Sequence, residues 1–456
     1  MLSTHMKKNT ELARLGVYNA RAPRYTSYPT AVQFTNNVGV DFTKTALSNL
    51  PADKPVSVYI HIPFCERLCW FCACRTQGTK SASPVAGYLD KVIAEIDLTA
   101  QYLPKGIKVS HVHWGGGTPT ILTPELITRL AEALEHRIPR TNDAEFSVEI
   151  DPTLVNQAKI DALVGVGMTR ASIGVQDFEP EVQKAIGRMQ SFEITQKCVN
   201  MLRRANVTSL NMDILYGLPH QTQTSVLDTI DNVLDLSPDR IALFGYAHVP
   251  WMAKRQQLID EKALPNGEAR YALFRAMGAE LETAGYVSVG IDHFAKSADS
   301  MALAQKNGQL RRNFQGYTTD NLDTMIGLGA SSISKYPTGY VQNSAKSSDY
   351  ISMIKAGTLA SYRGVETTHE DRIIARVIEM IMCDFTVDYT VLQREFDTDL
   401  RCIAQSLLHL QKEFKDFIQF SKTGFSITRS QRALARLVAK AFDQYSDSKA
   451  IFSAVS

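Results

Sequence analysis

The stretch VYIHIPFCERLCWFCACR, residues 58–75, joins an apolar run to a loop that contains four cysteines. The run is rich in β-branched residues and ends at a proline, as buried strands often do. Five similar runs follow along the chain, at residues 109–117, 144–151, 170–176, 209–219 and 240–250. The sequence therefore predicts six buried strands, the first over residues 56–64.

Helix signals fill the segments between these runs. Thr123 is a candidate N-cap followed by Pro124, and an apolar stripe with a period of 3.6 continues to Ile138. Alternating strands and helices predict a parallel sheet with right-handed crossovers. Six units are too few to close an eight-stranded barrel. We therefore predict an α/β fold with an open, partial (βα)6 TIM-like barrel, and a doubly wound sheet is the alternative.

The chain divides into three predicted parts. An N-terminal arm covers residues 1–50, and a catalytic domain covers 51–365, with its core strands at about 56–250. Residues 366–456 combine helical patterns with a predicted hairpin at 417–428, which is typical of a winged-helix-like, mostly helical domain. Its charges are mixed in sign, so a lid over the active site is favoured over DNA binding.

Composition excludes several classes of protein. The 456 residues are 44% hydrophobic and 21% charged, with a net charge of +2, as in ordinary folded proteins. The N-terminus lacks an apolar signal region, and no apolar run approaches the ~18 residues of a membrane span. We expect a cytoplasmic monomer that has no membrane span and binds no nucleic acid.

Four of the seven cysteines fall in one loop, as Cys65, Cys69, Cys72 and Cys74 in the spacing C-x3-C-x2-C-x-C. Thiolates are soft ligands that suit iron–sulfur clusters and zinc, and a reducing cytoplasm disfavours a disulfide. Structural zinc sites usually combine two separated ligand pairs. The compact group therefore favours an iron–sulfur cluster, with zinc as the alternative.

Polar and glycine-rich segments follow the later predicted strands, at HWGGGTPT (113–120), Glu149, Gln176 and Asp213. Active-site residues gather at the carboxyl ends of parallel strands. Carboxylates at apolar strand ends need polar partners, and three glycines let the backbone approach a ligand closely. We therefore expect a cofactor site at this edge.

The cysteine loop resembles the signature of the radical S-adenosylmethionine (radical SAM) superfamily. The resemblance implies that Cys65, Cys69 and Cys72 hold three irons of one [4Fe–4S] cluster, whose open fourth iron chelates S-adenosylmethionine. An electron from the cluster would then cleave the sulfonium to a 5′-deoxyadenosyl radical. A fourth sulfur ligand would block this chemistry, so Cys74 is predicted to be a catalytic residue and not a ligand.

Further motifs, including PRYTSYPT (23–30), SVEIDP (147–152) and DILYGLP (213–219), occur in one order across most of the chain. In this the chain is similar to the oxygen-independent coproporphyrinogen III oxidases, or coproporphyrinogen dehydrogenases, of haem biosynthesis. The resemblance implies oxidative decarboxylation of two propionates of coproporphyrinogen III to vinyl groups, giving protoporphyrinogen IX. An electron donor and an electron acceptor are required, and the sequence identifies neither. Trp70 and Ala73 depart from the usual Tyr and Gly.

The same resemblance implies two S-adenosylmethionine molecules. The first is expected to contact Tyr59, Gly116, Glu149 and Ile333. The second is expected to contact Phe71, Gly117, Thr118, Gln176, Arg188, Asp213 and Ala247. The substrate carries four carboxylates, for which the candidate partners are Arg24, Lys296, Arg311 and Arg312.

A related haem chaperone of the radical SAM type is the alternative function. Such relatives lack the PRYTSYPT arm and usually lack the fourth cysteine. Both features are present here, which favours the enzyme.

Overall fold

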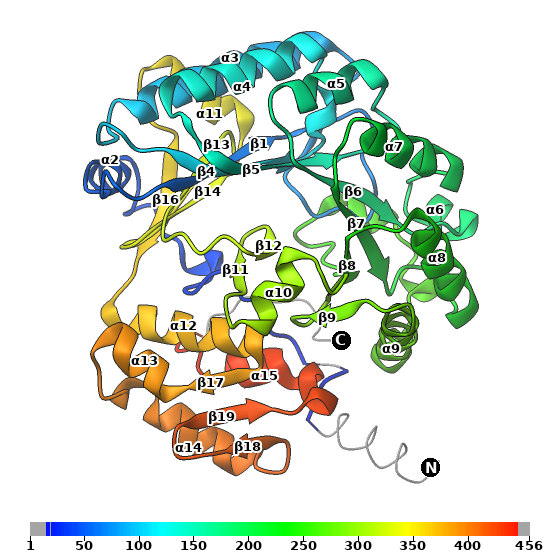
Figure 1. The fold of residues 1–456 in the computed structure, drawn as a ribbon, viewed down its shortest axis with the longest axis vertical. Helices are drawn as coiled ribbons and strands as arrows, with labels where there is room; N and C mark the ends of the chain where they lie inside the picture. The colour runs from blue at the N-terminus through cyan, green and yellow to red at the C-terminus, as the bar shows by residue number, and fades with distance from the viewer. Residues whose placement is uncertain (1–14, 19, 446–456) are drawn as a thin grey trace.

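The six predicted strands lie side by side in the structure, a computed structural model that describes residues 15–18 and 20–445 (Figure 1). They are β1 (Val56–Ile62), β4 (Val109–Gly116), β5 (Arg140–Ile150), β6 (Arg170–Gln176), β7 (Ser209–Tyr216) and β8 (Arg240–Gly245). The strands are parallel and neighbour one another in chain order. Chain order without a reversal is that of a partial barrel, which confirms the prediction, whereas a doubly wound sheet would reverse its direction of winding.

Helices cover the outer face of this sheet (Figure 1). They are α3 (Ala82–Ala100), α4 (Pro124–Arg137), α5 (Gln157–Gly165), α6 (Pro180–Ala185), α7 (Phe192–Arg204), α8 (Gln223–Leu236) and α9 (Gly267–Thr283). Thr123 caps α4 as predicted, because its side chain accepts a hydrogen bond from Leu126 N. Ile127 and Leu130 from α4 pack into one continuous core with fully buried Trp114.

The sheet continues beyond the predicted strands on both sides. Next to β1 lie β13 (Met325–Leu328), β14 (Ile333–Tyr336), β15 (Gly339–Asn343) and β16 (Ser361–Glu366), and beyond β8 lie β10 (His293–Ala295) and β9 (Val287–Val289). A separate hairpin consists of β11 (Arg311–Asn313) and β12 (Gly316–Thr318), and the nearby helices are α10 (Ser300–Lys306) and α11 (Ser347–Lys355). Strands of three to six residues carry too little periodicity to be predicted.

A helical unit closes the C-terminal part of the described chain (Figure 1). It contains α12 (His369–Asp384), α13 (Tyr389–Phe396), α14 (Ala404–Glu413), α15 (Ala435–Lys440) and the strands β17 (Thr386–Asp388), β18 (Ile418–Phe420) and β19 (Gly424–Ile427). The predicted hairpin is confirmed, with β18 antiparallel to β19. A 3-10 turn at Arg429–Leu434 precedes α15, and the bond from Phe442 N to Ala439 O tightens the end of this helix. The domain boundaries at residues 50 and 365 stay predictions.

The N-terminal arm packs on this helical unit. Val17 and Tyr28 share an apolar core with α12 and α15, and the hydroxyl of Tyr25 donates a hydrogen bond to Asp443 over 3.0 Å. The buried guanidinium of Arg436 donates to the carbonyls of Ala22 and Pro23. The arm therefore lies between the barrel and the C-terminal unit. None of the helices in the described ranges is long and apolar enough to cross a bilayer.

A buried carboxylate joins α3 to the strands beside β1. Glu95 accepts hydrogen bonds from Gly329 N (2.7 Å), Asn343 Nδ2 (2.6 Å) and Tyr350 Oη (2.7 Å). Burial raises the pKa of Glu95 to about 7, although these three bonds oppose the shift. Glu95 therefore fixes the turn between β13 and β14.

Replacing Glu95 by alanine leaves three buried donors without their acceptor. We expect Glu95→Ala to lower the free energy of unfolding by about 3 kcal/mol in urea titrations. The folded protein holds a proton that the unfolded chain releases below pH 7, so wild-type stability falls as pH rises toward 7 and the variant loses this slope. Exposed Glu132 on α4 is the matched control, and equal losses for both variants would contradict the role of Glu95.

Candidate active site

The cysteine loop begins where β1 ends, at the carboxyl edge of the parallel strands. Within it, β2 (Phe64–Cys65) pairs with β3 (Gln77–Gly78). Backbone bonds from Gln77 N to Pro63 O (2.8 Å) and from Thr79 N to Cys65 O (3.0 Å) close the loop at its base. Residues 65–78 therefore form a loop above the strand ends whose two ends are held together by backbone hydrogen bonds.

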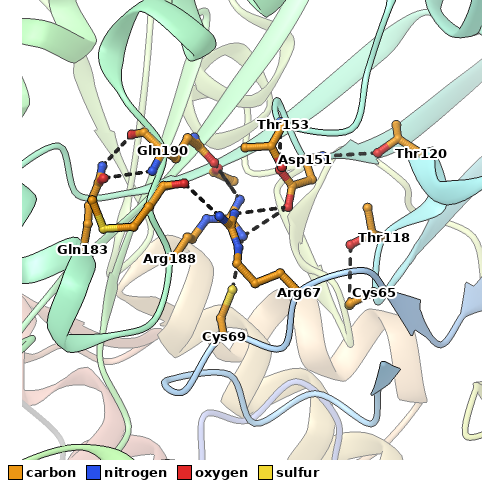
Figure 2. A network of polar contacts seen from close by, with 12 residues as sticks. Cys65, Arg67, Cys69, Thr118, Thr120, Asp151, Thr153, Gln183, Arg188 and Gln190 are labelled. Atoms are coloured by element: carbon orange, nitrogen blue, oxygen red, sulfur yellow. Dashed lines mark hydrogen bonds and ion pairs between the residues drawn. The ribbon is translucent and has the colours of Figure 1, made fainter. Parts of the chain in front are cut away.

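Hydrogen-bond donors surround the cysteine sulfurs. Cys65, Cys69, Cys72 and Cys74 are all free thiols. Thr118 Oγ1 donates to Cys65 Sγ, and Arg188 Nη1 donates to Cys69 Sγ, each over 3.5 Å (Figure 2). A hydrogen bond from the exposed Cys74 lowers the pKa of Cys72, whereas burial raises the pKa of Cys65 to about 11. Donors aimed at sulfur stabilise the thiolate form that binds metal.

The donor set fits an iron–sulfur cluster. Four free thiols lie on one closed loop, with hydrogen bonds to two of the sulfurs, as is common around such clusters. Across residues 15–18 and 20–445, no three His, Cys, Asp or Glu side chains converge as ligands of a single ion. In an iron–sulfur cluster each thiolate binds a different iron, so the sulfurs do not have to converge on one ion.

None of the three glycines at residues 115–117 could be replaced by a residue with a side chain without a steric clash or backbone strain. A side chain at Gly115 would lie 2.5 Å from the carboxylate of Glu149, and one at Gly117 would lie 2.7 Å from Phe64 O. Gly116 has a φ of +109°, which strongly favours glycine, and its neighbour is the ring of His61. The end of β4 therefore passes directly against the base of the cysteine loop, as the sequence predicts for a close approach.

Glu149 lies at the centre of a polar group inside the barrel. Its carboxylate accepts hydrogen bonds from Gly116 N (3.0 Å) and His113 Nε2 (3.3 Å). Burial opposes ionisation, but these bonds outweigh it and lower the pKa of Glu149. Tyr59 stacks on His113 with ring centroids 5.6 Å apart and bonds to His61 Nδ1 over 3.1 Å. Sequence analysis missed His113 as a partner of Glu149.

Asp213 faces Glu149 in the same interior. Burial and then the charge of Glu149 raise the pKa of Asp213 to about 6, against hydrogen bonds from Asn211 and Ser172. Both carboxylates line a cavity of about 230 Å³. Two close carboxylates with opposite pKa shifts attract a cation or hydroxyl donors into this space.

Arg188 reaches the cysteine loop from the segment after α6 (Figure 2). Its buried guanidinium pairs with Asp151 (3.5 Å) and donates to Gly174 O (2.8 Å) and Gln190 Oε1 (3.0 Å). Asp151 also lies 3.8 Å from Arg67 of the loop. The sequence identified Arg188 but missed its partners Gln190 and Asp151, and Asp151 lies 37 residues away, where it leaves no local pattern.

A buried glutamine joins the cysteine loop to the segment after β8. Gln256 Nε2 donates to the carbonyls of Phe71 (2.7 Å) and Ala247 (3.1 Å), and Gln256 Oε1 accepts from Val249 N (2.6 Å). Phe71 and Ala247, both predicted in the site, are thereby brought together. Sequence analysis missed Gln256 because it lies in the polar stretch KRQQ (254–257), which is typical of the protein surface.

The remaining predicted residues also lie near this edge. Gln176 ends β6 with a φ of +73°, an uncommon value for a residue with a side chain. Ile333 begins β14, and its carbonyl lies against Gly327 of β13. Gly327 in turn pairs with Tyr59 of β1.

Among the candidate substrate-binding residues, Arg24 donates to Gly245 O at the end of β8 (2.7 Å). Arg312 Nε donates to the carbonyl of Arg24 (3.3 Å), while Arg311 faces Glu379 at 4.0 Å. Lys296 instead binds Ser237 O (3.0 Å) and lies 3.3 Å from Asp239, both of which precede β8. It therefore lies at the opposite edge of the sheet, which argues against a contact with substrate at the cysteine loop.

Comparison with known proteins agrees with this geometry. Residues 59–233 match the Radical SAM superfamily. An oxygen-independent coproporphyrinogen III oxidase of Cereibacter sphaeroides is 52% identical over 446 residues, which cover 98% of this chain and 99% of the relative. The chain belongs to the family of oxygen-independent coproporphyrinogen III oxidases.

Other members of the family agree along the whole length. The enzyme of the same name from Helicobacter pylori J99 is 37% identical over 95% of this chain and 96% of its own. The solved structure of coproporphyrinogen III oxidase from Escherichia coli, described as a radical SAM enzyme, superposes with a TM-score of 0.89 at 37% identity. It covers 92% of this chain and 97% of its own. Membership of these oxidoreductases implies a [4Fe–4S] cluster and S-adenosylmethionine as cofactors.

The ion pair of Arg188 with Asp151 is a buried one, so its loss should be costly. Asp151→Asn leaves two guanidiniums without their carboxylate, and we expect a loss of about 3 kcal/mol in the free energy of unfolding. Arg188 lowers the pKa of Asp151 in spite of burial, so this stabilisation is present above the ordinary pKa of aspartate and is lost as pH falls through the lowered value.

Asp97→Asn is the matched control, since it removes an exposed pair with Arg137 at 2.5 Å. Such pairs contribute about 0–1 kcal/mol. Chemical denaturation at pH 7 compares the two variants. Similar losses in the free energy of unfolding for both variants would show that the buried pair of Asp151 stabilises the fold no more than an exposed pair does.

Proposed function

We propose that this protein converts coproporphyrinogen III to protoporphyrinogen IX in haem biosynthesis without oxygen. Each of two propionate side chains would give a hydrogen atom to a 5′-deoxyadenosyl radical and then lose carbon dioxide and one electron, which passes to the electron acceptor, to leave a vinyl group. The observation that supports the proposal most directly is the closed loop of free thiols at the carboxyl edge of the barrel. The substrate is inferred from relatives that match nearly the whole chain.

We propose Cys65, Cys69 and Cys72 as the three ligands of the cluster. When bound with S-adenosylmethionine, the reduced cluster supplies a carbon radical that removes a hydrogen atom from an unactivated carbon. Thr118 and Arg188 support this set by donating hydrogen bonds to two of the sulfurs. Cys74 is the exposed donor to Cys72, and this bond raises the pKa of Cys74. A fourth sulfur ligand would fill the open iron, so we propose Cys74 as a catalytic residue and not as a ligand.

We further propose that the interior of the barrel holds two S-adenosylmethionine molecules. Ionised Glu149 and the nearby Asp213 suit the ammonium and the ribose hydroxyls of such a ligand. The glycine triplet offers backbone groups at close range. Gln256 holds Phe71 next to Ala247, where an adenine would pack. These residues bind, orient and exclude water from the reacting carbon.

The haem chaperone is the second candidate function. Anaerobic incubation of the reconstituted protein with coproporphyrinogen III, S-adenosylmethionine and a reductant separates the two. The enzyme should form vinyl products together with one 5′-deoxyadenosine per decarboxylated propionate. Absence of vinyl products, together with stoichiometric retention of haem in a parallel incubation with haem, would instead establish the chaperone. The electron donor, the electron acceptor, the monomeric state and the cytoplasmic location stay predictions from the sequence.

Cluster ligation is tested by a pair of cysteine variants. Cys69→Ala removes a proposed ligand and should lose most of the iron and the broad absorption near ~400 nm that is typical of thiolate-bound clusters. Cys74→Ser should keep about four irons per chain but lose vinyl formation. Iron analysis and visible spectra of anaerobically purified protein provide the measurement. Loss of the cluster in Cys74→Ser would make Cys74 a ligand and overturn the assignment.

A further inference from the structure

Four guanidiniums from four separate parts of the chain converge on two short backbone segments. They belong to Arg24 of the N-terminal arm, Arg270 of α9, Arg312 of β11 and Arg436 of α15, and we call them the arginine cluster. Each donates at least one hydrogen bond to a carbonyl of residues 22–24 or 245–246. The second segment directly precedes Ala247 at the carboxyl end of β8, so the cluster borders the proposed cofactor site.

Arg24 and Arg270 approach the end of β8 together. Arg24 Nη2 donates to Gly245 O over 2.7 Å, and Arg270 Nη1 donates to Tyr246 O over 2.8 Å. A side chain at Gly245 would lie 3.2 Å from Arg270 Nη2 and 2.8 Å from the hydroxyl of Tyr216. Glycine at this position therefore lets the guanidinium of Arg270 lie against the strand end.

Arg312 and Arg436 approach from the side of the arm. Arg312 Nε donates to the carbonyl of Arg24, and Arg312 lies over the ring of Tyr317 at 4.5 Å. Its buried Nη1 has no hydrogen-bond partner within the part of the chain that the structure describes. Arg436, buried in α15, donates to the carbonyls of Ala22 and Pro23. A buried N–H group of a cation without an acceptor is costly, and an anionic ligand would satisfy it.

The positive charges of the arginine cluster act on one another. Burial and then Arg24 lower the pKa of Arg270, and burial, Arg24 and Arg312 lower the pKa of Arg436 to about 9. The carboxylate of Asp292 faces the cluster, but it also pairs with His293 at 2.7 Å. The carboxylate of a ligand would add negative charge beside these guanidiniums and could bind one of them with two hydrogen bonds.

We propose that the arginine cluster binds propionate carboxylates of the tetrapyrrole substrate. The proposal rests on the proposed function, and it adds Arg270 and Arg436 to the residues that sequence analysis suggested. A substrate with four carboxylates requires several cations, and guanidiniums bind such groups with two parallel hydrogen bonds. The arm, the barrel and the C-terminal unit each contribute to the site, so its assembly requires all three parts.

Exposed apolar side chains in the segment after β8 suit the macrocycle. Trp251 and Met252, in the segment after β8, are 49% and 68% exposed. Arg21 of the arm lies over the ring of Trp251 at 5.4 Å, so the arm and this segment are in contact. Exposed large apolar groups beside cations are what a flat or puckered ring with acidic side chains would need.

The test uses the full-length, cluster-loaded protein and coproporphyrin III, the stable oxidised form of the substrate, which carries the same four propionates. Spectroscopic titration should give measurable binding to the wild type. Coproporphyrin tetramethyl ester should bind at least about tenfold more weakly, since hydrogen bonds between charged groups are lost. Equal binding of the acid and the ester would overturn the proposal without any need for a variant.

Variants then locate the site. Arg24→Gln and Arg312→Gln should each weaken coproporphyrin III about tenfold and leave binding of the ester unchanged. Arg129→Gln, which removes an exposed pair with Asp90 on the outer face, is the control and should bind as the wild type. Affinity for S-adenosylmethionine, measured by equilibrium dialysis, should not change, because its carboxylate is assigned to the cysteine-loop side of the site.

Each outcome has a clear meaning. If only S-adenosylmethionine weakens in the two variants, the cluster binds the methionine carboxylate and the proposal fails. If coproporphyrin III binds both variants within about twofold of the wild type, the substrate lies elsewhere. Wild-type protein that binds coproporphyrin III through these arginines, yet forms no vinyl product from coproporphyrinogen III, would overturn the proposed function and leave the binding site standing.

Discussion

Parallel strands end together, so every charge placed at their shared edge has to find its partner there. The carboxyl edge of β1 and β4–β8 meets this requirement by pairing charges across strands. Glu149 at the end of β5 accepts a hydrogen bond from the backbone of Gly116 at the end of β4, and Asp151, two residues later, pairs with Arg188 from the segment after α6. The first contact joins two neighbouring strands, so the positions of these groups depend on the register of the sheet, and the second ties the end of β5 to the segment after α6.

The same pairing explains why the cysteine loop can be ordered without a long apolar anchor. Its base is closed by the bond of Gln77 to Pro63, and its sides are held by Arg188 at Cys69 and Gln256 at Phe71. These contacts come from different elements of the barrel. Thiolate charge developed on the loop therefore meets donors that the fold has already fixed, which reduces the reorganisation that metal binding requires.

Much of this arrangement could be predicted from local patterns. The six strands, the cap at Thr123 and the hairpin at 417–428 follow from periodicity and turn residues, and all are present. The glycine triplet and the cysteine spacing likewise place the site at the strand ends. The short strands β13–β16 were missed because a segment of four to six residues is too short to show a recognisable hydrophobic periodicity. The partners Asp151 and Gln256 were missed because a contact between distant residues leaves no mark beside either one.

Lys296 and Arg24 illustrate where sequence reasoning ends. Both are basic residues close to family-like motifs, yet Lys296 lies by Asp239 before β8, whereas Arg24 reaches Gly245 at its far end. A strand of six residues separates the two edges, and adjacency to a motif does not tell which edge a flanking residue reaches. The difference arises because β10 runs antiparallel to β8 and carries its last residue, Ala295, back to Arg240. Function at this end of the barrel therefore depends on strand direction as much as on residue type.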